Sequence, residues 1–228
     1  MSVCRNLLAM SVLGVAGLLV GGSSAPAAAI TVNNPSFEDA GAGVPSWGAT
    51  GGSGTGVYAP IVPGTFGSLP NGTQVAYVYN NGARIYQQTA EPLTPGRIYT
   101  FSVFLGERND TFQPRTWVSI LPASELADYL ADPVGAGTEY LTITQVEPAD
   151  VESASFAQFS AVFDTTLPAN AALVSAYAGQ NLVISVHAVA NGETDVDHVS
   201  FSYTEVPEPA ALSLLGLGAF TLVARCRR

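Results

Sequence analysis

The chain has 228 residues and a formal net charge of −10, with eight Lys and Arg against 18 Asp and Glu. So acidic a composition argues against nucleic acid as a partner, because phosphates need basic side chains, and it favours neutral or cationic ligands. The two cysteines stand at positions 4 and 226, near the chain ends. Disulfides and cysteine-based catalysis or metal binding are therefore excluded between them.

The first 29 residues have the pattern of a secretory signal peptide. Arg5 supplies a positive charge, and residues 7–20 form an apolar run without a charged side chain. Ala27 and Ala29 occupy the −3 and −1 positions of a cleavage site, so we expect a helical leader that directs the chain to the secretion translocon and is cut after Ala29. The alternative is a buried N-terminal helix.

Residues 30–205 form the predicted folded domain, which is long enough to bury a core of its own. It contains no Lys and four Arg. Short runs that alternate apolar and polar residues are separated by Gly, Pro, Asn and Asp, which predicts an all-β fold, an antiparallel β-sandwich of the jelly-roll type. The expected strands include residues 75–79, 99–105, 116–120, 159–163, 182–186 and 199–203.

Local signals add a turn, a helix and a loop. Asn80-Asn81-Gly82 predicts a hairpin between the strand at 75–79 and one that begins near Ile85. The one predicted helix covers residues 124–131, with Ser124 as its cap and Pro133 as its stop. The loop 41–56 is rich in Gly, Ser and Thr and carries Trp47, which we expect to fill the core.

Several short motifs stand out in the predicted domain. The opening residues 33–38 read Asn-Asn-Pro-Ser-Phe-Glu, and the closing residues 197–201 read Asp-His-Val-Ser-Phe. Shorter motifs are Pro-Ser-Trp at 45–47, Ile-Tyr-Gln-Gln at 85–88 and the run from Leu93 to Phe101. Together they resemble galactose-binding-like jelly rolls, a group that includes many carbohydrate-binding modules. The chain departs from the pattern at His198, where a second Asp is usual.

In such jelly rolls the first and last strands often share a structural calcium ion. Period-two alternation gives Asp197 the parity of Val199 and points it inward, where a carboxylate needs a partner. Glu38 ends the first strand run and is placed to meet it. We therefore expect Glu38 and Asp197 to bind calcium. The alternative is an Asp197 that is hydrogen-bonded or faces solvent.

Sugar binding is expected at Arg84, Tyr86 and Trp117. Tyr86 and Trp117 have the opposite parity to the apolar residues of their strands, and Arg84 shares the parity of Tyr86. Aromatic faces stack on sugar rings while polar neighbours bind the hydroxyl groups. The alternative is that Trp117 packs in the core or at an edge.

The residues available for catalysis are few. His187 and His198 are the only histidines, and His187 is expected to face solvent. The sequence shows neither a Gly-x-Ser-x-Gly elbow nor zinc-ligand spacing. Carboxylate pairs such as Asp195 and Asp197 arise by chance in so acidic a chain. We therefore expect a protein that is not an enzyme, with a secreted hydrolase as the alternative.

The last segment, residues 206–228, has three parts: the tripeptide Pro207-Glu208-Pro209, a short apolar run at 210–224 that is expected to be helical, and the basic residues Arg225, Arg227 and Arg228. In this order the three parts resemble the PEP-CTERM sorting tail of Gram-negative bacteria. In that family a membrane-embedded exosortase cuts near the tripeptide. The prolines keep the chain extended there, and the arginines stay on the cytoplasmic side. The alternative is a plain membrane anchor.

Together these features predict an exported, non-catalytic protein of the cell envelope or extracellular matrix. It would cross the inner membrane, be held there transiently by its tail, and then be processed by an exosortase. The resemblance to carbohydrate-binding modules implies an extracellular polysaccharide as ligand. The alternative within the same fold is a dedicated lectin with one defined sugar.

Overall fold

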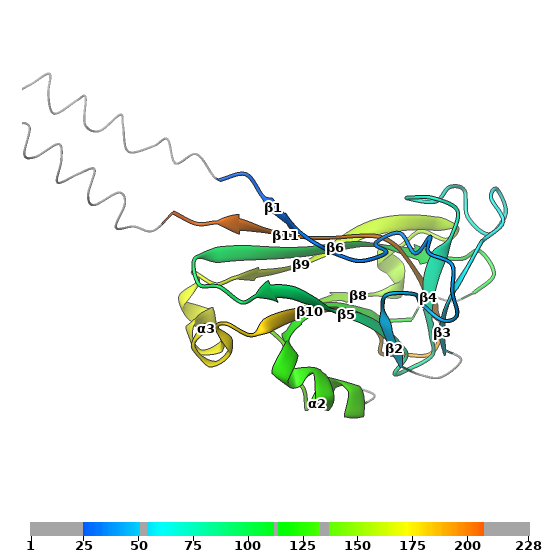
Figure 1. The fold of residues 1–228 in the computed structure, drawn as a ribbon. Coiled ribbons are helices and arrows are strands. Elements are labelled where there is room, and N and C mark those ends of the chain that lie inside the picture. The colour runs from blue at the N-terminus through cyan, green and yellow to red at the C-terminus, as the bar shows by residue number, and fades with distance from the viewer. Residues whose placement is uncertain (1–24, 51–53, 112–113, 133–136, 208–228) are drawn as a thin grey trace, which may run out of the picture.

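The computed structural model describes residues 25–50, 54–111, 114–132 and 137–207. Two antiparallel sheets pack face to face as a jelly-roll sandwich (Figure 1). The first sheet contains β1 (Ala28–Ile30), β3 (Thr55–Tyr58), β4 (Val75–Tyr79), β6 (Arg97–Glu107), β9 (Ser155–Asp164) and β11 (Glu193–Glu205). The second contains β2 (Gly48–Thr50), β5 (Arg84–Pro92), β7 (Thr116–Pro122), β8 (Thr142–Val146) and β10 (Asn181–Ala188). The predicted all-β sandwich is confirmed.

The strand order places β11 in the middle of the first sheet. That order is β3-β4-β11-β6-β9, and β1 also pairs with β11. β6 follows β11 along most of its length, whereas β4 pairs with its first residues and β1 with residues 201–203. The second sheet has the order β2-β5-β10-β7-β8. The predicted leader helix and the apolar run at 210–224 lie largely or wholly outside the described residues.

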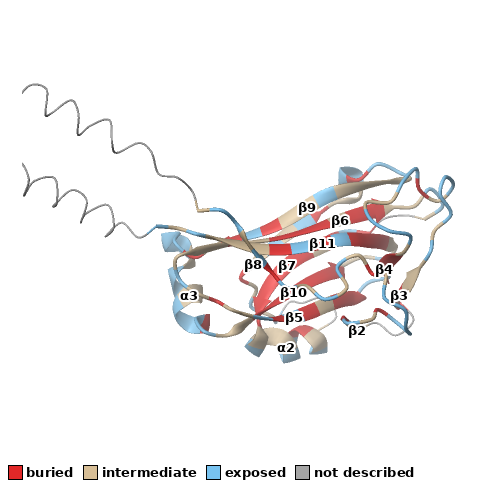
Figure 2. Ribbon diagram, turned by 45° about the horizontal axis from the view of Figure 1, so that its top comes forward, coloured by how far each residue is buried: buried red, intermediate tan, exposed pale blue. Residues whose placement is uncertain are grey.

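The core lies between the two sheets, where apolar residues alternate along the facing strands. Phe101 and Leu105 of β6 and Ile184 of β10 are fully buried, and Figure 2 shows the buried residues concentrated on the inner strands. Each such side chain contributes about 1.5–3 kcal/mol by leaving water. Trp47 fills the core edge as expected, with its ring centroid 5.5 Å from that of Phe37.

The predicted hairpin at Asn80-Asn81-Gly82 is wrong. β4 pairs with β3 and β11 in the first sheet, whereas β5 pairs with β2 and β10 in the second. The Asn80 N–H donates to Gly192 O, and the Gly82 N–H donates to Ala188 O. The turn is therefore bonded to the connection between β10 and β11, and it carries the chain from one sheet to the other.

The helices lie outside the sandwich. The predicted helix at 124–131 is observed as a 3₁₀ turn, Ala123–Glu125, followed by α2 (Leu126–Ala131), although no side chain caps its start. A second helix, α3 (Ala171–Tyr177), follows the 3₁₀ turn Pro168–Asn170 and was not predicted. Helix α3 has only seven residues, which is too short for the sequence to show a helical period, and this is why it was missed. A third 3₁₀ turn covers Pro148–Asp150.

Helix α2 covers the outer face of the second sheet. Arg84 of β5 is only 1% exposed and donates to the carbonyl oxygens of Tyr129 and Asp132, the latter at 2.8 Å. His187 is fully buried, with ring centroids 5.7 Å from Trp117 and 5.8 Å from Tyr129. The expectation that His187 faces solvent is therefore wrong, because α2 and its neighbours occupy that face.

We expect Arg84→Leu to lower the free energy of unfolding by about 2–4 kcal/mol, because three carbonyl oxygens, those of Gly82, Tyr129 and Asp132, lose a charged donor. Arg115→Leu is the matched control. Arg115 is half exposed and pairs with Glu147 at 3.0 Å, and the loss of an exposed pair costs about 0–1 kcal/mol. Urea unfolding of both variants measures the difference. Equal losses would contradict a structural role for Arg84 under α2.

Candidate functional site

A cavity of about 340 Å³ opens at the first sheet. Tyr58 of β3, Tyr77 and Tyr79 of β4, Arg108 just after β6 and Glu193 at the start of β11 line it. Four separate stretches of chain contribute these side chains. The site is therefore a product of the strand order β3-β4-β11-β6.

Strand alternation directs the tyrosines away from the core. In β4, Ala76 and Val78 belong to the core cluster, so Tyr77 and Tyr79 point to the outer face of the first sheet. Gly56 of β3 lies opposite Tyr77, and a Cβ at Gly56 would approach the Tyr77 hydroxyl to 2.7 Å. Glycine therefore leaves room for the ring. Tyr77 meets Tyr58 edge-on, with ring centroids 6.0 Å apart.

Arg108 forms ion pairs with two acidic side chains at the cavity wall. It forms ion pairs with Glu193 at 2.8 Å and with Asp110 at 2.9 Å, and its guanidinium carbon lies 5.5 Å from the centroid of the Tyr58 ring. These bonds raise the pKa of Arg108, with the hydrogen bond to Asp110 as the largest cause. One cation among two carboxylates leaves the wall slightly acidic. It therefore suits neutral or cationic ligands better than anions.

Asp195 lies behind Tyr58 and is fully buried. Its Oδ1 accepts a hydrogen bond from the Tyr58 hydroxyl at 2.7 Å, and its Oδ2 has no hydrogen-bond partner within the described part of the chain. Burial raises the pKa of Asp195 from its ordinary 3.8 to about 8, against the opposing effect of the Tyr58 bond. Burial also raises the pKa of Tyr58. At neutral pH both groups therefore keep their protons.

A bulge in β11 decides which way the acidic side chains point. The register against β6 shifts between Asp197 and Ser200, and His198 has a φ of 46°. Val196 before the bulge and Val199 after it both belong to the core. Asp197 is buried as expected, but it does not share the inward direction of Val199. It lies on the outer face of the sheet with Asp195.

Both predicted calcium ligands, Asp197 and Glu38, accept hydrogen bonds from backbone N–H groups of the turn at residues 71–74. Asp197 accepts the Asn71 N–H at 2.8 Å, and burial raises its pKa to about 6. Glu38 accepts the N–H groups of Thr73 and Gln74, each at 2.8 Å. Across the described ranges, no group of three or more His, Cys, Asp or Glu is arranged to hold a metal. These residues do not fit a calcium site unless the hydrogen bonds are given up, and calcium binding stays an untested prediction.

The predicted sugar contacts lie on the other sheet. Arg84 is buried under α2, the Tyr86 ring lies 6.4 Å from that of Tyr129, and Trp117 packs edge-on against Tyr140 at 6.0 Å. Arg84 and Tyr86 contact Tyr129 of α2, and Trp117 contacts Tyr140. The part of all three residues in ligand binding stays an untested prediction. The cavity itself was missed, although Tyr77 and Tyr79 share one strand face and Arg108 is one of four basic residues in the domain.

Asp195 should make the stability of the protein fall as the pH rises. Between about pH 4 and 8 the folded chain holds a proton at Asp195 that the unfolded chain has released, so the free energy of unfolding decreases through this window. Asp195→Asn should flatten the decrease, leaving the smaller part that Asp197 contributes below about pH 6. Melting temperatures measured from pH 5 to pH 9 check this. Asp128→Asn, which removes the same charge from an exposed position on α2, is the matched control. A slope in Asp195→Asn equal to that of the parent would contradict the assignment.

Glu38→Ala should lower the free energy of unfolding by about 1–2 kcal/mol, because the turn at 71–74 loses its acceptor. We expect the same loss in calcium and in excess chelator. Thermal melting in both buffers checks this. A loss seen only in calcium would instead place the ion at Glu38.

Several solved structures have similar folds, and two of them are cyclases. The apo form of a cyclase from Fischerella sp. superimposes with a TM-score of 0.61 at 20% identity, over 80% of this chain and 98% of that one. The Stig cyclase Fisc from Fischerella sp. TAU, in complex with (3Z)-3-(1-methyl-2-pyrrolidinylidene)-3H-indole, gives 0.59 at 19% identity, over 80% and 100%. The CBM22 tandem domain of Paenibacillus barcinonensis Xyn10C gives 0.48 at 12%, over 82% and 48%. The two cyclase likenesses show the fold alone.

The C-terminal residues 205–228 match the PEP-CTERM protein-sorting motif. The predicted sorting tail is thereby confirmed, and the motif implies export to the cell envelope and processing by an exosortase. Within the ranges that the structure describes, no helix is long and apolar enough to cross a membrane. Cleavage after Ala29 stays a prediction, and a cut there would fall inside β1.

No curated protein matches the chain. Residues 28–202, however, match the sequence profile of the HpiC1 cyclase family. The expectation of a protein that is not an enzyme is therefore not supported. The match covers nearly all of the folded domain, and the chain belongs to the HpiC1-like cyclase family.

Proposed function

We propose that this chain is an exported enzyme that protonates a small, planar organic molecule in the tyrosine-lined cavity and thereby isomerises or cyclises it. The observation that carries the proposal is the hydrogen bond between Tyr58, which lines the cavity, and the buried Asp195 behind it. Membership of a cyclase family supports it. So does the indole-derived compound in the complex of the Fischerella Stig cyclase Fisc, as a planar ring system of suitable kind.

Binding would rest on the rings of Tyr77 and Tyr79. A cavity of about 340 Å³ lies in the size range of small-molecule sites, and aromatic walls favour flat apolar ligands. The ion pair of Arg108 and Glu193 supplies a polar border that orients the ligand. Anionic ligands are disfavoured by the two carboxylates that surround Arg108.

Proton transfer would run from Asp195 through Tyr58. In the structure the Tyr58 hydroxyl donates to Asp195 Oδ1. For the transfer this hydrogen bond would reverse, so that the protonated carboxyl group donates to the Tyr58 oxygen and the phenolic proton is free to move to the ligand. The ligand gains a proton, Tyr58 regains one from Asp195, and Asp195 becomes a carboxylate. The rearranged cation then loses a proton to the Tyr58 oxygen while the Tyr58 hydroxyl proton passes to the Asp195 carboxylate, which returns both groups to their starting forms. The reaction is an isomerisation and needs no other reactant.

The cavity wall would stabilise the cationic intermediate. Tyrosine faces attract cations, and the Glu193 carboxylate adds an opposite charge close by. The buried position of Asp195 keeps it an acid near neutral pH, which is the condition for a general acid at that pH. Each of these effects favours the charged state over the neutral ligand.

A second candidate is glycan binding at the same cavity. Tyr79 is 43% exposed beside the polar pair of Arg108 and Glu193. An exposed aromatic ring next to polar groups is how proteins commonly hold sugars. In that case the protein would bind extracellular polysaccharide, as the sequence predicts, and the Tyr58–Asp195 pair would serve stability alone.

The indole compound of the Fisc complex is the probe for the first test. We expect the purified protein to bind it and to exchange the hydrogens beside its exocyclic double bond for deuterium in D₂O, followed by NMR. Asp195→Asn and Tyr58→Phe should retain binding by calorimetry and lose roughly 10²–10⁴-fold in exchange rate. Tyr77→Ala should lose binding, while Tyr86→Phe on the other sheet should change neither.

Parent-like exchange in both Tyr58→Phe and Asp195→Asn would overturn the catalytic proposal. A glycan array separates the second candidate. Sugar binding that is lost in Tyr79→Ala and kept in Asp195→Asn, together with no exchange of the probe, would favour the binding protein.

A further inference from the structure

The folded domain runs into the sorting motif without a linker. β11 ends at Glu205, the Val206 N–H donates to Gly96 O at 2.7 Å, and the exposed Pro207 opens the tripeptide. The match to the sorting motif itself begins at residue 205. The chain is therefore held in the sandwich up to the residue that precedes Pro207.

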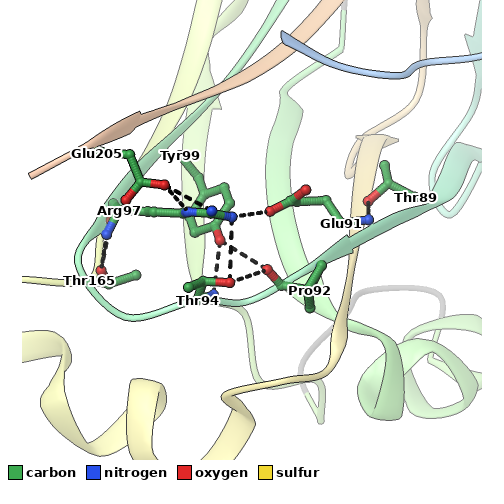
Figure 3. Close-up of polar contacts among 8 residues, drawn as sticks. All are labelled: Thr89, Glu91, Pro92, Thr94, Arg97, Tyr99, Thr165 and Glu205. Carbon is green, nitrogen blue, oxygen red and sulfur yellow. Dashed lines mark hydrogen bonds and ion pairs between the residues drawn. The ribbon is translucent and has the colours of Figure 1, made fainter. Parts of the chain in front are cut away.

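Arg97 holds this end of β11 in place. It opens β6 directly opposite Glu205, and its guanidinium pairs with the Glu205 carboxylate at 2.8 Å and with the Glu91 carboxylate (Figure 3). The same guanidinium carbon lies 3.9 Å from the centroid of the Tyr203 ring. One cation thus contacts two of the last three residues of β11. We call Glu91, Arg97, Tyr203 and Glu205 the tail clamp.

Hydrogen bonds hold the turn between β5 and β6, which carries Arg97 of the tail clamp. The Tyr99 hydroxyl donates to Pro92 O at 2.9 Å and accepts the Thr94 N–H at 2.9 Å. Thr165 accepts the Arg97 N–H at 2.8 Å. These bonds fix residues 92–97 and with them Gly96 O, the acceptor for Val206.

Both ends of the described chain leave the sandwich on this side. β1 runs antiparallel to the end of β11, with Ala28 opposite Tyr203 (Figure 1). The cavity lies at the other end of β11, where Glu193 and Asp195 stand. Thirteen residues of β11 separate the two ends, which is about 40 Å at the rise of a strand. The chain therefore leaves the sandwich toward the sorting motif at the clamp end, and the cavity lies at the opposite end of β11.

We propose that the tail clamp controls how fast the exosortase can process the chain. An enzyme that cuts near residues 207–209 must hold extended chain on both sides of the bond. Residues 203–206 are unavailable while Tyr203 and Glu205 pair with β6 and Val206 is bonded to Gly96. Local opening of the end of β11 then precedes cleavage, and the clamp sets how often this opening occurs.

The test follows the full-length precursor in cells that contain the exosortase. We expect Arg97→Gln to be processed roughly three- to tenfold faster than the parent chain in a pulse-chase immunoblot, because the end of β11 opens more often. Arg115→Gln removes an exposed ion pair on another part of the surface and should leave the rate unchanged. Melting of the purified variants shows that the fold is kept.

A second variant leaves the clamp residues untouched. Insertion of Gly-Ser-Gly-Ser between Val206 and Pro207 adds residues that are not paired with the sandwich. It should raise the processing rate of the parent chain to that of Arg97→Gln. The same insertion in Arg97→Gln should add little. Equal rates for the parent and a folded Arg97→Gln, a slower Arg97→Gln, or an insertion without effect on the parent would each overturn the proposal.

Discussion

The pairing of β11 with β6 is the constraint on which the rest of the structure depends. It runs from Asp195 opposite Gly106 to Glu205 opposite Arg97, with one interruption after Asp197. That interruption lets Val196 and Val199 both face the core while Asp195 lies on the outer face, where Tyr58 covers it. In a regular strand with the same sequence, Val196 and Val199 would point to opposite faces of the sheet, and one of them would leave the core.

The scarcity of positive charge makes each arginine of the domain distinctive. Arg84 binds the carbonyl groups at the end of α2, Arg97 holds the end of β11, Arg108 borders the cavity, and Arg115 pairs with Glu147 at the surface. The chain has no lysine, and within the described ranges these four arginines are the only side chains that carry a permanent positive charge. A substitution at any of the first three is therefore expected to disturb one particular part of the molecule.

Strand β11 supplies residues both to the proposed catalytic cavity and to the tail clamp. The start of β11 supplies Glu193 and Asp195 to the cavity, and its end supplies Tyr203 and Glu205 to the tail clamp. Opening at the clamp end unpairs residues far from the cavity, because β4 and the last residues of β6 pair with the start of β11 and not with its end. Processing of the tail can therefore proceed while the cavity keeps its shape.

The sequence by itself determined the sorting tail, the all-β class, most strand positions and the burial of Trp47, because these follow from local composition and period-two alternation. Only the tertiary structure decided that the turn at Asn80 crosses between sheets, that α2 buries Arg84 and His187, and that the bulge turns Asp197 outward. It also brought Tyr58, Arg108 and Asp195 together. The alternation of apolar and polar residues in the sequence shows only which side chains of one strand share a face. Which distant strand pairs with it, and what covers its outer face, depend on contacts between residues far apart in the chain.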